Sequence, residues 1–173
     1  MNNLNIKLLS DNATTPTRAY GVSAGLDIYA AETVVIEPQE KILLATDIAV
    51  DIPEGYVGLL TSRSGVSSKT HLVVETGKID AGYNGHVKVN IKNDHIRIGK
   101  KKSRSEAYLN IYGGATLDLT NDKKYKNRTY QINKGEKIAQ LVITPIVTPE
   151  VNVVEEFNGK SERDTKGFGS SGY

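Results

Sequence analysis

The sequence predicts an all-β fold. Short stretches rich in Val, Ile, Leu and Tyr alternate with polar residues, and turn-forming Gly and Pro separate them at roughly even spacing. Hardly any segment has the periodicity of an amphipathic helix. Short, evenly spaced strands with intervening turn residues are typical of β-sandwiches and barrels. At 173 residues, the chain has the length expected of a single domain.

Seven segments have the alternation or the β-branched composition of strands. In chain order they are 5–9, 33–37, 42–44, 48–52, 56–60, 87–91 and 138–143. Pro53-Glu54-Gly55 predicts a turn between two of them, because proline presets its own backbone angle and glycine tolerates the exit from the turn. The one expected helix is short and covers 64–69, where polar residues follow Arg63.

Composition excludes several classes of protein. The chain has no cysteine, so disulfides and thiolate metal sites are excluded, and its three histidines lack the spacing of metal ligands. No apolar run reaches the roughly 18 residues of a membrane-spanning helix, and the first ten residues lack the order of a signal peptide. We therefore expect a soluble, cytoplasmic protein without a membrane partner.

The net charge of +2 is unevenly distributed. Residues 94–128 contain nine basic and four acidic side chains, which gives this segment a net charge of +5. Apolar residues on both sides of Gly113-Gly114 predict a hairpin-like arm between basic stems. Connections of this length are uncommon in compact domains unless they have a function. We expect a basic insert at about 94–128 that is either a solvated face or a surface for a partner.

Five short motifs contain residues suited to chemistry. In order they are Ala24-Gly25-Leu26-Asp27, Arg63-Ser64-Gly65, Ile79-Asp80-Ala81-Gly82-Tyr83-Asn84-Gly85, Gly135-Glu136-Lys137-Ile138-Ala139-Gln140 and Gly167-Phe168-Gly169-Ser170-Ser171-Gly172. A guanidinium, a hydroxyl and free amides at a helix start favour anions. Each motif alone also has an ordinary interpretation: Asp27 as a turn or strand-end residue, Asp80 in a plain β-turn, Gln140 as a surface amide.

The last motif has the G-x-G-x-x-G spacing of dinucleotide-binding loops. That fingerprint requires a strand before it and a helix after it, and here the chain ends one residue after the last glycine. A glycine-rich tail with hydroxyls and one aromatic ring can instead close over a nucleotide. The alternative is a disordered polar terminus.

Taken in this order, the five motifs resemble the signature motifs of the trimeric dUTPase family. The resemblance spans nearly the whole chain apart from the insert. It implies a dUTPase-like jelly-roll or β-clip subunit that assembles as a homotrimer, with each active site shared among subunits. The implied reaction is hydrolysis of dUTP to dUMP and pyrophosphate with Mg²⁺.

The resemblance also implies a role for particular residues. Asp80 would activate the attacking water, Tyr83 would exclude a ribose 2′-hydroxyl, and Asp27 would reach the metal through water. The hairpin backbone from Thr76 through Ile79 to Tyr83 would pair with uracil. The phosphates and the base would be held by Arg63, Ser64, Gly65, Gln140, Arg163, Phe168, Gly169, Ser170 and Ser171, the last five from a C-terminal lid at about 159–173.

The basic insert is a departure from ordinary members of that family. It resembles the extra segment of some phage-encoded dUTPases, a group with members that bind and relieve a mobile-element repressor. This resemblance implies a possible protein partner at 94–128 and, for a phage protein, the host cytoplasm as its location. A regulatory protein that binds a repressor or another macromolecule through the insert, with or without catalysis, is therefore the alternative function.

Three further alternatives are weaker. The related dCTP deaminase resembles this chain up to Gly85, but it has a catalytic glutamate where this chain has Asn90, and an amide cannot shuttle the proton. A P-loop is excluded because Val154 stands where its first glycine is required. A nucleic-acid binder could use the tyrosines interleaved with the insert's cations, but the overall charge is small and no nucleic-acid-binding motif is present, so nucleic acid is an unlikely partner.

Overall fold

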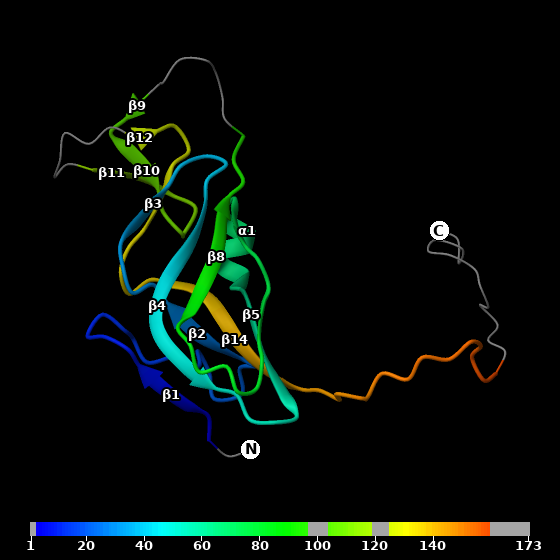
Figure 1. Cartoon of the computed structure of the whole chain (residues 1–173). Helices are drawn as coiled ribbons and strands as arrows, with labels where there is room; N and C mark the ends of the chain where they lie inside the picture. Colours follow the sequence, from blue (N-terminus) through cyan, green and yellow to red (C-terminus); the bar gives the residue numbers. More distant parts are fainter. Residues whose placement is uncertain (1–2, 97–103, 119–124, 160–173) are drawn as a thin grey trace.

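The structure is a computed structural model that describes residues 3–96, 104–118 and 125–159 (Figure 1). These residues form fourteen strands and one short helix. The strands are β1 (Asn5–Leu8), β2 (Gly25–Tyr29), β3 (Val34–Ile36), β4 (Lys41–Asp51), β5 (Tyr56–Ser62), β6 (Leu72–Val74), β7 (Gly77–Ile79), β8 (Val87–Asn93), β9 (Arg104–Ser105), β10 (Ala107–Leu109), β11 (Ala115–Leu117), β12 (Tyr125–Lys126), β13 (Tyr130–Ile132) and β14 (Lys137–Pro145), and the helix is α1 (Ser64–Lys69). The predicted all-β fold is confirmed.

Two four-stranded antiparallel sheets enclose the core. One has the order β1-β4-β8-β6 and the other the order β2-β14-β5-β7. Strand β8 shows the alternation most clearly, because Val87, Val89 and Ile91 are buried while Lys88 between them is exposed. Such a period of two places alternate side chains on opposite faces of a sheet. The second sheet supplies Ile28 and Leu141 to the same core and also positions the site described below.

The described part of the insert extends a third sheet, of order β11-β10-β13-β3. Strands β10 and β11 form a hairpin around Gly113, whose φ of 85° is a left-handed conformation that favours glycine. The turn lies against α1, because a Cβ on Gly113 would stand 2.7 Å from the backbone oxygen of Lys69. Ile111 from this turn is buried in the core cluster. The predicted hairpin is therefore present, and it packs on the body of the protein.

Asn93 fastens the base of the insert to the core. Its fully buried side-chain amide donates hydrogen bonds of 2.9 Å to the carbonyl oxygens of Ile36 and Arg128, and its Oδ1 accepts one from the backbone N–H of His95. These three bonds join β3, β8 and both stems of the insert. An unpaired polar group at this depth would cost about 1–3 kcal/mol, so the three bonds fix where the insert begins and ends.

The predicted boundaries differ from the structure at β4, which is one strand where two were expected. The irregularity lies between Ala45 and Ile48, where Asp47 has a φ of 53°. Its backbone N–H donates to His86 Nε2 at 2.9 Å, and the hydroxyl of Thr46 donates to the carbonyl of Val87. Side chains thus take over the hydrogen bonds that the bulge interrupts, and the strand continues.

The expected helix at 64–69 is confirmed as α1. Strands β2, β6 and β13 were not among the predicted strands, because each has only three to five residues, too few to show a clear alternation. After β14 the chain runs away from the body of the molecule (Figure 1), and residues 147–159 are exposed. Within the described ranges, no helix has the length and apolar character needed to cross a membrane.

Candidate active site

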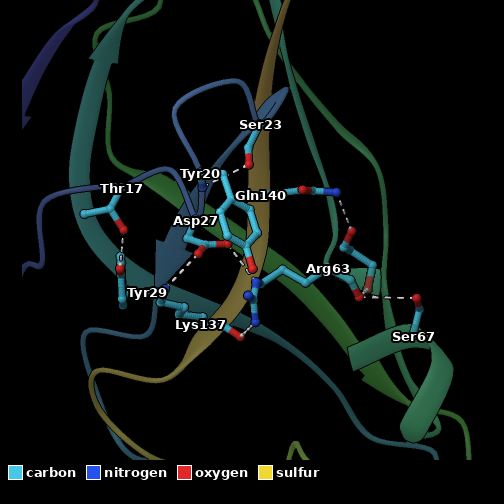
Figure 2. Close-up of polar contacts among 10 residues, drawn as sticks. Thr17, Tyr20, Ser23, Asp27, Tyr29, Arg63, Ser67, Lys137 and Gln140 are labelled. Carbon is cyan, nitrogen blue, oxygen red and sulfur yellow. Dashed lines mark hydrogen bonds and ion pairs between the residues drawn. The ribbon is translucent and has the colours of Figure 1, made fainter. Parts of the chain in front are cut away.

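Three neighbouring strands bring the residues of three motifs close together. Asp27 on β2 pairs with Gln140 on β14, and Gln140 pairs in turn with Thr61 on β5. Arg63 follows β5 directly, at the point where α1 begins. Segments that are far apart in the sequence therefore meet on one face of the β2-β14-β5 sheet (Figure 2). The alternative interpretation of Asp27 as a turn or strand-end residue is wrong, because Asp27 stands in the middle of β2.

Asp27 lies between two cations. Its Oδ1 is 2.7 Å from Arg63 Nε and its Oδ2 is 2.9 Å from Lys137 Nζ, and the residue is only 5% exposed. Burial by itself raises the pKa of Asp27, but the bonds from Lys137 and Arg63 outweigh burial and lower it. The carboxylate is therefore ionised at neutral pH, and the cluster of one anion and two cations has a net positive charge suited to an anionic ligand.

The remaining phosphate-site candidates surround this cluster. Gln140 Nε2 donates to the carbonyl of Ser62 at 3.2 Å, and this side chain occupies the space beside Gly25. A Cβ on Gly25 would stand 2.5 Å from Gln140 Oε1, so a larger residue at this position would displace the Gln140 side chain. Ser64 and Gly65 form the exposed first turn of α1. Guanidinium, amide and hydroxyl donors thus converge on the end of β5.

The third motif forms an exposed turn after β7. The backbone N–H of Tyr83 donates to the carbonyl of Asp80 at 3.2 Å, and Gly82 has the positive φ, 82°, that the turn requires. The hydroxyl of Tyr83 donates to the carbonyl of His86, and a Cβ on Gly85 would stand 2.6 Å from the tyrosine ring. The ring thus rests on bare backbone, with 48% of the residue exposed.

Within one chain the structure does not bring this turn to the cationic cluster. Ile79 pairs with Gly58 near the start of β5, whereas Arg63 follows the end of that strand. At about 3.3 Å per residue, the five positions from Gly58 to Arg63 span roughly 16 Å. Thr76 and Asp80 are exposed and Ile79 is buried. Candidate base and candidate phosphate ligands therefore occupy two separate surfaces of the subunit.

Five predicted site residues lie outside the described residues: Arg163, Phe168, Gly169, Ser170 and Ser171. Sequence reasoning missed Lys137, whose Nζ also lies 5.6 Å from the centre of the Tyr29 ring. Tyr29 in turn shares a hydrogen bond of 2.6 Å with the hydroxyl of Thr17. The available signal was that Lys137 stands within the fourth motif, but only the pairing of β14 with β2 places it beside Asp27.

The fold and the site define a β-sheet protein whose cationic cluster is suited to a phosphorylated ligand. The dUTPase family model matches residues 11–103 and 119–172. The gap between the two matched segments falls within the predicted insert. A probable deoxyuridine 5′-triphosphate nucleotidohydrolase of Schizosaccharomyces pombe is 34% identical over 167 residues, which cover 96% of each chain.

Solved structures of two phage proteins are also similar. The dUTPase of Staphylococcus bacteriophage 80alpha with dUPNHPP is 58% identical, covers both chains fully and has a TM-score of 0.93. The dUTPase of S. aureus phage phi11, described as showing a species-specific insert, is 57% identical over 92% of this chain and 100% of that one, with a TM-score of 0.86. A mutant of the phi11 protein, 56% identical with a TM-score of 0.85 over 91% of this chain and 100% of that one, is described with a structural Mg(II) ion.

The chain therefore belongs to the dUTPase family. The predicted family, its all-β β-clip subunit and the class of enzyme, a nucleotide hydrolase, are confirmed. The homotrimer expected from the sequence is the assembly that this family implies. The similarity to phage proteins agrees with the phage-like insert.

Proposed function

We propose that this protein hydrolyses dUTP to dUMP and pyrophosphate, with Asp80 as the base that activates water for attack on the α-phosphorus. The observation that supports this most strongly is the division of the motif residues between the cationic cluster and the exposed turn that contains Asp80. A triphosphate repels an anionic nucleophile, so hydrolysis depends mainly on charge neutralisation and positioning. The cationic cluster would neutralise the charge of the phosphates, and the Asp80 turn would position and activate the water.

The cationic cluster is suited to binding the phosphates. Arg63 uses Nε for Asp27, and Ser64 and Gly65 are exposed beside it. Backbone amides at the first turn of α1 and the side-chain amide of Gln140 add donors. Preorganised donors of this kind stabilise the charge that develops on the phosphoryl oxygens.

Mg²⁺ fits this site as an ion held largely by the substrate. The described residues contain no cluster of three or more His, Asp or Glu side chains that could hold a metal by themselves. Mg²⁺ commonly keeps several waters and binds through one or two carboxylates together with substrate phosphates. Asp27, paired with cations through both oxygens, would contact such an ion through water. The ion would neutralise phosphate charge.

The separation of the two surfaces supports a site shared in a homotrimer. Asp80 and Arg63 lie at opposite ends of β5, so one chain cannot present both to the same phosphorus without a large rearrangement. Cyclic assembly brings different surfaces of successive copies together. We infer that the Asp80 turn of one subunit faces the cationic cluster of another, and that the lid at 159–173 completes the site.

Release of pyrophosphate tests the reaction. The protein is incubated with dUTP, dTTP, dCTP or UTP in Mg²⁺ buffer, and pyrophosphate is measured. We expect hydrolysis of dUTP alone. No release from dUTP would refute the proposed function, and deamination of dCTP would favour the related deaminase.

Tyr83→Ala is expected to weaken discrimination against the ribose sugar. The ring is fixed by the His86 carbonyl and by Gly85, so its removal opens space where a 2′-hydroxyl would lie. We expect the ratio of kcat/KM for dUTP over UTP to fall about tenfold or more. Tyr112→Ala, at an exposed tyrosine of the insert, is the matched control and should keep the wild-type ratio. Unchanged discrimination in Tyr83→Ala would rule out the steric role.

A second function is supported by the exposed surface of the insert. Tyr112 and Leu117 are 66% and 62% exposed, and both belong to the β10–β11 hairpin or its turn. The 80alpha structure is described under the statement that phage dUTPases control transfer of virulence genes by a G protein-like mechanism. We propose that this hairpin binds a protein partner of the mobile-element repressor type, in addition to catalysis.

Substitution of these two side chains separates the two functions better than deletion of 94–128. Deletion would also remove Ile111 from the core and the Arg128 carbonyl that Asn93 binds. Tyr112→Ser with Leu117→Ser should weaken binding of a purified mobile-element repressor at least about tenfold, measured by calorimetry, and leave dUTP hydrolysis within twofold. Equal loss of both activities would assign the hairpin to the catalytic site.

A further inference from the structure

Lys137 contacts the other two members of the cationic cluster, Asp27 with its side chain and Arg63 with its backbone. Its Nζ lies 2.9 Å from Asp27 Oδ2, and its carbonyl oxygen accepts a hydrogen bond of 3.5 Å from Arg63 Nη1. Figure 2 shows Asp27 with Arg63 on one side and Lys137 on the other. Neither contact of Lys137 requires a substrate.

Asp27 determines how the Arg63 guanidinium is oriented. The carboxylate accepts from Nε, at 2.7 Å, and the Lys137 carbonyl accepts from Nη1, so two sides of the planar guanidinium are fixed. A planar group held in this way directs its remaining N–H donors in one direction. The direction of the free N–H donors of Arg63 therefore depends on the orientation of the Asp27 carboxylate.

Lys137 holds the other oxygen of that carboxylate. The amine is itself confined by the Tyr29 ring at 5.6 Å, and the Tyr29 hydroxyl is tied to Thr17 at 2.6 Å. A continuous set of contacts thus runs from Thr17 through Tyr29, Lys137 and Asp27 to Arg63. Loss of the Lys137 amine would free one carboxylate oxygen that is almost fully buried.

We propose that Lys137 is a positioning residue that fixes Asp27, and through it aims the Arg63 guanidinium at the triphosphate. This inference rests on the proposed function, since it takes Arg63 as a phosphate ligand. Lys137 acts through Asp27 on the phosphate ligand Arg63, and binding of the nucleoside part of the substrate does not depend on Lys137. Affinity for the triphosphate and affinity for the bare nucleoside should therefore respond differently.

Lys137→Gln tests this directly. We expect the Kd of the non-hydrolysable analogue dUpNHpp to rise about tenfold, which is about 1.4 kcal/mol, and the Kd of deoxyuridine to stay within twofold. Lys137→Arg should recover the analogue affinity to within threefold. The control is Lys134→Gln, which removes the same charge from an exposed lysine that is bonded to Asn12 and lies three residues before Lys137. This substitution should leave both dissociation constants unchanged.

A double-mutant cycle distinguishes positioning from direct contact with phosphate. If Lys137 acts through Asp27, Asp27→Asn with Lys137→Gln should bind dUpNHpp no more weakly than Asp27→Asn alone. Additive losses, equal losses for deoxyuridine, or an unchanged Kd in Lys137→Gln would overturn the inference. Because both constants are measured without turnover, they are independent of the pyrophosphate assay, whose failure in the wild type would refute the reaction instead.

Discussion

Asp80→Asn is expected to reduce kcat for dUTP by about three orders of magnitude, because the amide cannot take a proton from the attacking water. The side chain is exposed in the turn after β7, so the substitution removes no core contact. Asparagine is close to aspartate in size, and the Kd for dUpNHpp should stay within about threefold. A loss confined to kcat is the signature of an interaction made only in the transition state.

Single-turnover release of pyrophosphate, together with calorimetric binding of the analogue, checks this expectation. Asp11→Asn, at another exposed aspartate, is the control and should retain full turnover. Near-normal turnover in Asp80→Asn would remove this carboxylate from the role of base. A parallel loss of analogue binding would instead indicate that Asp80 holds the substrate.

The fold could be predicted from the sequence where the alternation is undisturbed. Strand β8 and the helix α1 follow directly from local pattern. The bulge in β4 could not be predicted, because the groups that stabilise it, His86 and the Val87 carbonyl, are about 40 residues away in the chain. The burial of Asp27 in β2 could not be predicted for the same reason, since its partners Lys137, on β14, and Arg63, which follows β5, are also distant in the chain.

The candidate site was predictable as a set of residues and not as an arrangement. The order of the motifs identified Arg63, Asp80 and Gln140. Their spacing in the sequence gives no indication that the turn containing Asp80 lies near the start of β5, where Gly58 is roughly 16 Å along the strand from Arg63. Strand register decides that separation, and it is the reason why we propose a site shared between subunits. Lys137 escaped notice for the same reason, because cross-strand pairing places it beside Asp27.

Removal of residues 163–173 is the second change with a large expected effect. The removed segment contains Arg163, Phe168 and two serines, which the resemblance places on the phosphates and uracil. Loss of such donors and of the lid should reduce kcat/KM for dUTP by roughly 100-fold or more. The structure favours action of the tail on another subunit, because the chain leaves the body of the molecule after β14 (Figure 1). In this segment the apolar residues Val147, Val151 and Phe157 are each at least 90% exposed. Apolar side chains exposed in this number along one segment are usually covered by a partner.

Mixed trimers test whether the tail and Asp80 serve the same site from different chains. Asp80→Asn chains and chains lacking 163–173 are each expected to be nearly inactive alone. The two kinds of chain are mixed in equal amounts, unfolded and refolded together. If every site takes Asp80 and the tail from two different subunits of a cyclic trimer, each mixed trimer has one complete site in three, and about a quarter of wild-type activity returns. If both come from one chain, every site lacks one of them and activity stays near zero. Chains refolded separately and then combined are the control, since without exchange of subunits they should remain inactive in either case.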